Sequence, residues 1–126
     1  MAEFVFAMNP IAASRPRISK WGAYYTGPYK KFKMDAEKIV MDTLGPKWVP
    51  LEEPLRTEVY MFVTRPKRTK LIFPKADIDN YLKAIFDCLN GKLWVDDKQI
   101  IVVHASKAWA EPGVAGHFVL NVEEIN

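Results

Sequence analysis

Apolar and polar residues alternate most regularly between Leu55 and Val63, where every second residue is apolar or a threonine. A period of two is that of a strand with one buried face, so we predict a strand there. Two other stretches repeat their apolar positions every three to four residues, which is the helical period. They predict helices over residues 29–44 and 79–90, with apolar stripes formed by Phe32, Ala36, Ile39, Val40 and Leu44, and by Leu82, Ile85, Phe86 and Leu89.

Shorter apolar runs predict three more strands, at residues 3–8, from Ile100 toward Trp109, and at 117–122. The short connection at Pro112-Gly113 predicts that the last two strands are antiparallel neighbours. Before the first helix, prolines predict an extended, partly irregular excursion up to Gly27. The order β-α-β-α-β-β predicts an α+β fold, a single domain whose mixed sheet is covered by two helices.

Composition narrows the class of protein. The chain has 126 residues and 49% hydrophobic residues, which fits one folded domain over residues 1–126. No apolar run approaches the roughly 20 residues that span a bilayer, and the first residues do not resemble a signal peptide, so we expect a cytoplasmic protein. Cys88 is the only cysteine, which excludes an intrachain disulfide and a thiolate zinc site. Its place in a helical stripe predicts that it packs in the core.

The formal net charge is only +3, but the basic residues are clustered. One acid-free cluster contains Arg65, Lys67, Arg68 and Lys70, and an earlier one contains Arg15, Arg17 and Lys20 beside several tyrosines and Trp21. Cations near stackable rings suit a phosphate backbone and unstacked bases. Two solvated loops would give the same pattern, and the clusters alone do not decide between these readings.

Four aspartates bracket the second predicted helix: Asp77 and Asp79 before it, Asp96 and Asp97 after it. Asp79 could cap the helix and the second pair could form a turn. The helix is short, about 12 residues or ~18 Å, and a returning chain could bring three or four carboxylates together. Such a cluster would repel itself without a hard divalent cation such as Mg²⁺. Lys83, four residues after Asp79, could support a phosphoryl transition state or form a salt bridge.

Other chemistries fit poorly. His104 and His117 lie in predicted strands and lack the spacing of a ligand pair. The glycines form no phosphate-binding motif, and no serine has an evident base partner. Triad hydrolysis is therefore a poor fit, whereas metal-dependent phosphodiester hydrolysis suits the acids and the basic loops.

The central block resembles the RusA family of Holliday-junction resolvases, small endodeoxyribonucleases carried mainly by phages and prophages. The matching motifs are D-x-D-N-x-x-K at residues 77–83, Phe86-Asp87, Leu89-Asn90-Gly91, and W-V-D-D-K-Q-I at residues 94–100; Arg15-Pro16-Arg17 is similar to the family's basic N-terminal segment. The chain departs from many relatives in reading Lys75-Ala76 before Asp77.

The resemblance implies a RusA-like homodimer that binds four-way DNA junctions and cuts them symmetrically with Mg²⁺ or Mn²⁺, in bacterial or phage-infected host cytoplasm. Its implied metal ligands and catalytic acids are Asp77, Asp79 and Asp97, with Asp96 a further candidate ligand and Lys83 the functional lysine. Lys107 matches a basic residue after the long strand and is a candidate DNA contact. The other candidate DNA contacts are Arg15, Arg17, Arg65, Lys67, Arg68 and Lys70.

Three hypotheses follow from the sequence. The chain is a metal-dependent junction resolvase used in recombination, repair or phage DNA processing, or a related nuclease that prefers flaps or forks. Alternatively, it is a nucleic-acid-binding module whose aspartates only cap a helix and form a turn. The first two differ in substrate, and the third predicts binding without cleavage.

Overall fold

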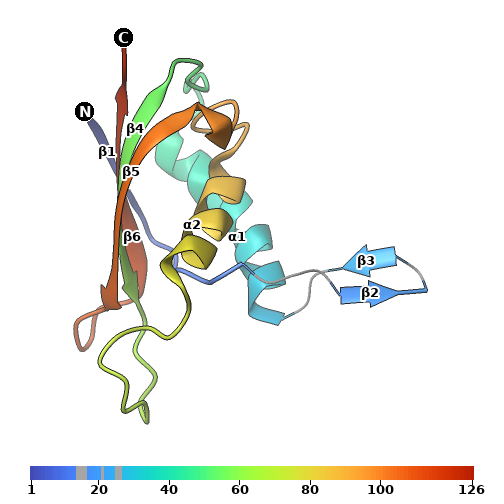
Figure 1. Cartoon of the computed structure of the whole chain (residues 1–126), viewed down its shortest axis with the longest axis vertical. Coiled ribbons are helices and arrows are strands. Elements are labelled where there is room, and N and C mark those ends of the chain that lie inside the picture. The colour runs from blue at the N-terminus through green and yellow to red at the C-terminus, as the bar shows by residue number, and fades with distance from the viewer. Residues whose placement is uncertain (14–16, 21, 25–26) are drawn as a thin grey trace.

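A computed structural model describes residues 1–13, 17–20, 22–24 and 27–126. Its main sheet has four strands in the order β1-β6-β4-β5, and two helices cover one face of this sheet (Figure 1). A separate two-stranded hairpin is formed by β2 and β3. The bounds are β1 Ala2–Phe6, β2 Arg17–Ser19, β3 Gly22–Tyr24, α1 Gly27–Leu44, β4 Leu55–Val63, α2 Ile78–Leu89, η1 Asp97–Gln99, β5 Ile100–Trp109 and β6 His117–Glu124.

The predicted fold class and the order of the main elements are confirmed, and the alternating stretch forms β4 with the bounds that its period predicts. All five inward residues of this strand are buried, from Leu55 to Val63. They pack against α1 and α2 through residues such as Val40, Ile85 and Leu89. Cys88 is buried, which confirms its place in the core, and this burial raises the pKa of its thiol to about 11.

The last two strands run antiparallel, as predicted, but the expected hairpin is wrong, because β6 does not pair with β5. β6 is antiparallel to both β1 and β4, while β5 is parallel to β4 and forms an edge of the sheet. The connection from β5 therefore crosses the end of β4. The crossing is fixed by the bond from the Ala110 amide to the Val63 carbonyl, 2.7 Å, and by the bond from the Gly116 amide to Thr64 Oγ1, 3.0 Å.

Glycine is required at position 116 of this crossing because a larger residue would clash with its neighbours. A Cβ atom at this position would lie 2.1 Å from Asn9 Oδ1 and 2.7 Å from Thr64 Oγ1. The Asn9 side chain also accepts a hydrogen bond from the Thr64 amide, 2.8 Å. The end of β1, the end of β4 and the start of β6 are thus tied together.

The segment before α1 contains more regular structure than its prolines predict, since the hairpin of β2 and β3 lies within it. In the part of the chain that the structure describes, neither helix is long and apolar enough to cross a membrane.

Two methionines provide a matched test of the core. Met61 in β4 is 1% exposed, whereas Met34 in α1 is 69% exposed. Met61→Ala should lower the free energy of unfolding by about 2–5 kcal/mol, because it leaves a cavity between sheet and helices. Met34→Ala should change it by less than about 0.5 kcal/mol. Urea titration of both variants measures this, and equal losses would contradict the assigned face of β4.

Candidate functional site

The first acidic pair lies at the N-terminus of α2. Asp77 is the N-cap residue, and its carbonyl accepts hydrogen bonds from the amides of Asn80, 3.1 Å, and Tyr81, 3.3 Å. Its side chain makes no capping bond, and Asp79 lies within the first turn. The capping role considered for Asp79 is therefore wrong, since Asp77 occupies that position. Both carboxylates are exposed.

Lys107 in β5 fixes the chain just before Asp77. Its Nζ donates to the carbonyls of Pro74, 2.9 Å, and Ala76, 2.6 Å. On the other side, the Ala13 amide donates to the Asn80 carbonyl, 2.9 Å, so the N-terminal segment also meets the first turn of α2. Lys107 is half-buried and acts as an anchor in this structure. Its predicted contact with DNA stays a prediction.

The two residues of the second acidic pair, Asp96 and Asp97, have different roles. Asp96 forms a capping box, in which its side chain accepts from the Lys98 amide and its own amide donates to Gln99 Oε1. The turn-forming alternative therefore holds for Asp96. Asp97 begins η1, is half-buried, and makes no side-chain hydrogen bond or ion pair within the described residues. Of the two, Asp97 has the carboxylate that is available to a ligand.

Gln99 fastens this turn to the start of β4. Its Nε2 donates to the carbonyls of Leu51, 2.9 Å, and Glu53, 3.0 Å. Leu51 in turn pairs with the chain around Trp94, through the bonds from its amide to the Leu93 carbonyl and from the Val95 amide to its carbonyl. Asp97 is thus held near residues 51–53 and the C-terminal end of α2.

The two acidic pairs lie at opposite ends of α2. The helix has 12 residues and so spans about 18 Å. β5 begins next to Asp97 and reaches the Asp77 end only at Lys107, seven residues later, or roughly 23 Å of extended chain. Among the described residues, no group of three or more His, Cys, Asp or Glu side chains could hold a metal ion. The convergence expected within one chain does not occur.

Lys83 lies one turn after Asp79 and is exposed. Within the described part of the chain it forms no ion pair with Asp79 or Asp87, so the predicted salt-bridge alternative is not observed. Asp87 instead accepts a hydrogen bond from the Tyr29 hydroxyl, 3.5 Å. The Lys83 ammonium is consequently available on the face of α2 that carries Asp79.

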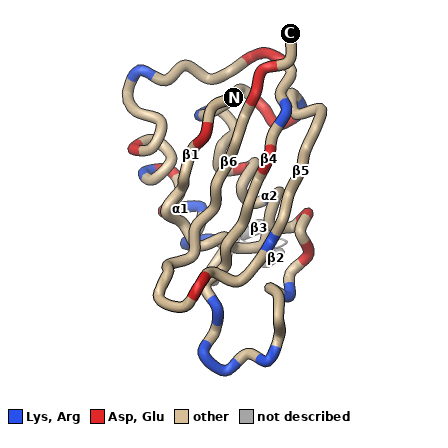
Figure 2. The backbone as a smooth tube through the Cα atoms, turned by 90° about the vertical axis from the view of Figure 1, so that its left-hand side faces the viewer, with Lys and Arg blue, Asp and Glu red and all other residues tan. Residues whose placement is uncertain are grey.

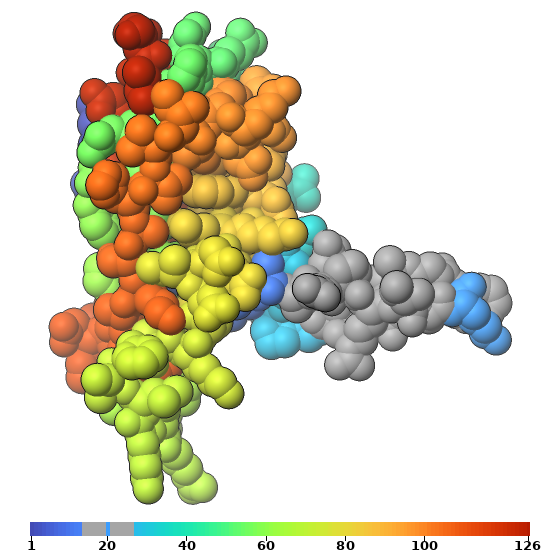
Figure 3. Space-filling view, in the orientation of Figure 1, coloured from blue at the N-terminus to red at the C-terminus, as the bar shows by residue number. Residues whose placement is uncertain are grey.

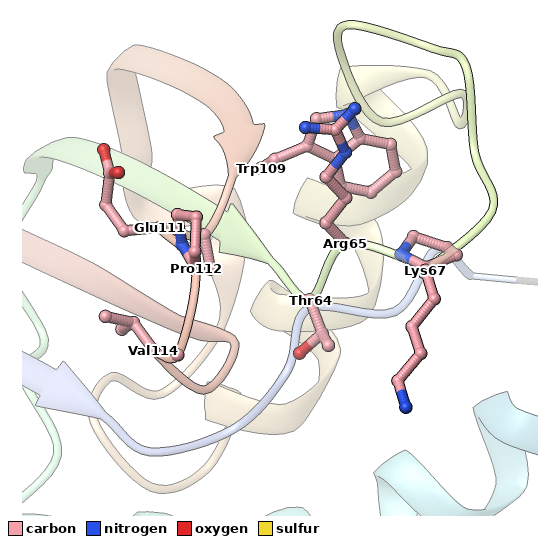
Figure 4. Close-up of a pocket in the computed structure, with 10 residues that line it drawn as sticks. Thr64, Arg65, Lys67, Trp109, Glu111, Pro112 and Val114 are labelled. Atoms are coloured by element: carbon pink, nitrogen blue, oxygen red, sulfur yellow. The ribbon is translucent and has the colours of Figure 1, made fainter.

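The basic residues after β4 lie on a loop that projects beyond the sheet (Figures 2 and 3). We call residues 65–75 the basic loop; its exposed cations are Arg65, Lys67, Arg68, Lys70 and Lys75. At its base, a cavity of about 490 Å³ is lined by residues that include Arg65, Lys67, Trp109 and Glu111 (Figure 4). Arg15 lies outside the described residues, and Arg17 is described only as part of the backbone of β2.

Two functional features escaped the sequence patterns. One is the anchoring role of Lys107, because a lysine in a strand predicts a solvent contact. The other is an exposed apolar segment within the basic loop, at residues 71–73. Its signal was present in the sequence as three successive apolar residues, KLIFPK, without the period of a helix or strand.

Lys107→Met tests the anchor. Removal of the two charge-assisted hydrogen bonds, each worth about 1.5–3 kcal/mol, should loosen residues 74–79. Amide hydrogen exchange in this segment should accelerate at least about tenfold, with little change in the core of the sheet. Lys98→Met, at an exposed lysine of η1, is the control and should leave the exchange of this segment unchanged. Equal protection in both variants would show that Lys107 does not hold the loop.

Comparison with known proteins identifies the family of the chain. Residues 7–115 match the family model described as endodeoxyribonuclease RusA. A relative in Bacillus subtilis (strain 168), the uncharacterized protein YqaN, is 26% identical in an alignment that covers 86% of this chain and 88% of the relative. The acidic pairs, α2 and the basic loop all lie inside the matched residues. The chain belongs to the RusA family of endodeoxyribonucleases.

Proposed function

We propose that the protein is a homodimeric, Mg²⁺-dependent endonuclease that resolves four-way DNA junctions by paired symmetric cuts. The observation that carries the proposal is an exposed carboxylate pair, Asp77 and Asp79, held at a helix N-terminus beside an acid-free basic loop. Carboxylates alone would repel DNA, and cations alone would only bind it. Their juxtaposition suits hydrolysis of a phosphodiester with a divalent cation between acid and phosphate.

The donor chemistry of these residues fits Mg²⁺, which prefers carboxylate oxygens and retains several waters. Asp77, Asp79 and Asp97 would hold the ion, and Mn²⁺ could substitute for it. Asp96 is less suited, because its side chain is engaged in the capping box. When bound, the cation would polarise the phosphoryl oxygen and lower the pKa of a water nucleophile. Lys83 would place positive charge near the same phosphate from the next turn of α2.

The distance between the acidic pairs supports a dimer. Asp97 of one chain lies too far from Asp77 of the same chain to share an ion with it, so we propose that a second copy supplies Asp97. A two-fold axis would complete two identical sites at once, as symmetric cleavage requires. Each site would then contain Asp77 and Asp79 from one copy and Asp97 from the other.

The free edge of β5 is the surface that fits this arrangement. No described strand pairs with this edge, and its first half exposes Ile101 and Val103 and carries no lysine or glutamate. Such an edge favours pairing with another strand. Antiparallel pairing of β5 with its copy about an axis near Val102 would set residue 97 opposite residue 107, because both are equally far from 102. Lys107 contacts the carbonyl of Ala76, so Asp97 would arrive beside Asp77.

Cleavage of synthetic DNA tests the activity. A labelled four-way junction, a matched duplex and a flap are incubated with the protein and Mg²⁺ or a chelator. We expect paired symmetric nicks in the junction alone, lost in chelator and lowered at least about 100-fold in Asp79→Asn, while junction binding persists. If the flap is cut in preference to the junction, the substrate is a flap or fork and not the four-way junction. Binding with no metal-dependent cutting would refute the nuclease assignment for this chain.

Mixing two inactive variants tests the shared site. An equal mixture of Asp77→Asn and Asp97→Asn chains, refolded together, gives mixed dimers in which one site has lost both aspartates and the other is intact. About a quarter of the wild-type sites should be recovered, as single nicks. A mixture of Asp77→Asn with Asp79→Asn is the control, because each of its sites lacks one ligand. If both mixtures recover the same activity, or if neither recovers any, Asp97 of the second copy does not complete the site.

A further inference from the structure

The second half of the basic loop carries three successive exposed apolar side chains. Leu71 is 42% exposed, Ile72 85% and Phe73 52%, and we call these three residues the apolar tip. Single exposed apolar residues are common on protein surfaces, but three in succession on a projecting loop indicate a contact surface. The anchoring and charge of the surrounding residues indicate what the tip contacts.

The tip is held on both sides by the end of β5. Trp109 Nε1 donates to the Leu71 carbonyl, 2.9 Å, and Lys107 Nζ donates to the Pro74 carbonyl, 2.9 Å. The Leu71 amide is also bonded to Thr69 Oγ1, 3.2 Å. Lys107 Nζ lies 5.5 Å from the centre of the Phe73 ring, within the range of a cation–π contact. The loop backbone is therefore bonded to the protein, while Ile72 is almost fully exposed and Leu71 and Phe73 are about half exposed.

The positive charge around the apolar tip indicates which class of molecule it contacts. Five cations and no acid lie between Thr64 and Ala76: Arg65, Lys67, Arg68, Lys70 and Lys75. This charge repels a second copy of the same loop and attracts a phosphate backbone. An apolar group carried to DNA by such a loop can pack favourably on the face of a base. In a continuous duplex these faces are stacked, whereas at a branch point the stacking is interrupted.

We propose that the apolar tip packs against unstacked bases at the branch point and so makes the protein selective for branched DNA. This inference rests on the proposed function, because it concerns the substrate of the same site. Phosphate contacts by the basic loop attract any DNA and carry no information about branching. Apolar side chains that enter a disrupted stack can supply this selectivity.

The loop also limits where the cut can fall. Ile72 lies five positions before Asp77, so their Cα atoms are at most about 18 Å apart. One strand of DNA rises by about 3.4 Å per nucleotide. The scissile phosphate should therefore lie within about five nucleotides of the branch point.

The test uses proteins that all carry Asp77→Asn, so that the DNA stays intact. Ile72→Ser/Phe73→Ser replaces two of the three apolar side chains of the tip and substitutes no charged residue, although it removes the Phe73 ring beside Lys107 Nζ. Val49→Ser is the matched control, since Val49 is also exposed, at 75%, and lies outside the basic loop. Lys70→Ala is the charge control. Binding is measured on a four-way junction and on its duplex arm, with 2-aminopurine placed at the branch or inside an arm.

We expect the double serine variant to lose about 5- to 150-fold in junction affinity, the range for loss of one base contact, with duplex affinity changed less than about twofold. With the parent protein, the fluorescence of 2-aminopurine at the branch should rise as the base is unstacked. The double serine variant should not cause this rise. Lys70→Ala should weaken junction and duplex equally, and Val49→Ser should weaken neither. Circular dichroism and light scattering check that the fold and the oligomeric state are retained.

Unchanged junction affinity in the serine variant would overturn the inference, as would an equal loss on junction and duplex. A change from dimer to monomer would also overturn it, because the tip would then contact the second copy. If the parent protein with an intact tip bound junction and duplex equally, the proposed function would fail, and the inference would fail with it. This last outcome is measured on the parent protein alone, so it can be told apart from a result that overturns only the role of the apolar tip.

Discussion

The rest of the structure depends on the way in which α2 is fixed along the sheet. Its buried face packs into the core through Ile85 and Leu89, its start is held by Lys107, and the turn after it is held by Gln99. The helix therefore acts as a rigid spacer of about 18 Å between two acidic groups. Any chemistry that needs three carboxylates must bridge this spacing, and within one chain no described segment does so.

Regular, local patterns were predictable from the sequence, because they record burial directly. The alternation of β4 and the stripe of α2 both come from one face packed on the core, and each was placed within one residue of its observed start. Pairing of β6 was not predictable in this way. A short connection favours a hairpin, but here β4 lies between the two strands, and the crossing depends on contacts of Gly116 with Asn9 and Thr64, which are distant in sequence.

The candidate site was predictable by residue type and not by position. Spacing along the chain singled out Asp77, Asp79, Asp96 and Asp97, and the family resemblance then favoured Asp97 in the second pair. Neither signal states at which end of the sheet the chain returns. The parallel pairing of β5 with β4 sets that direction and separates Asp97 from the others. Lys107 illustrates the same limit, since its bonds to two carbonyls of a distant loop leave no trace in its neighbours along β5.

Electrostatics connects the proposed dimer with the proposed cofactor. Asp77 and Asp79 tolerate each other because both are exposed to water and near the positive end of α2. A third carboxylate from a second copy would oppose association by like-charge repulsion, and a divalent cation would remove this opposition. Binding linkage is reciprocal, so whatever the cation contributes to dimer stability, dimer formation contributes equally to cation affinity. A single chain would then hold neither the ion nor the cleavage activity, and both would arise only in the dimer.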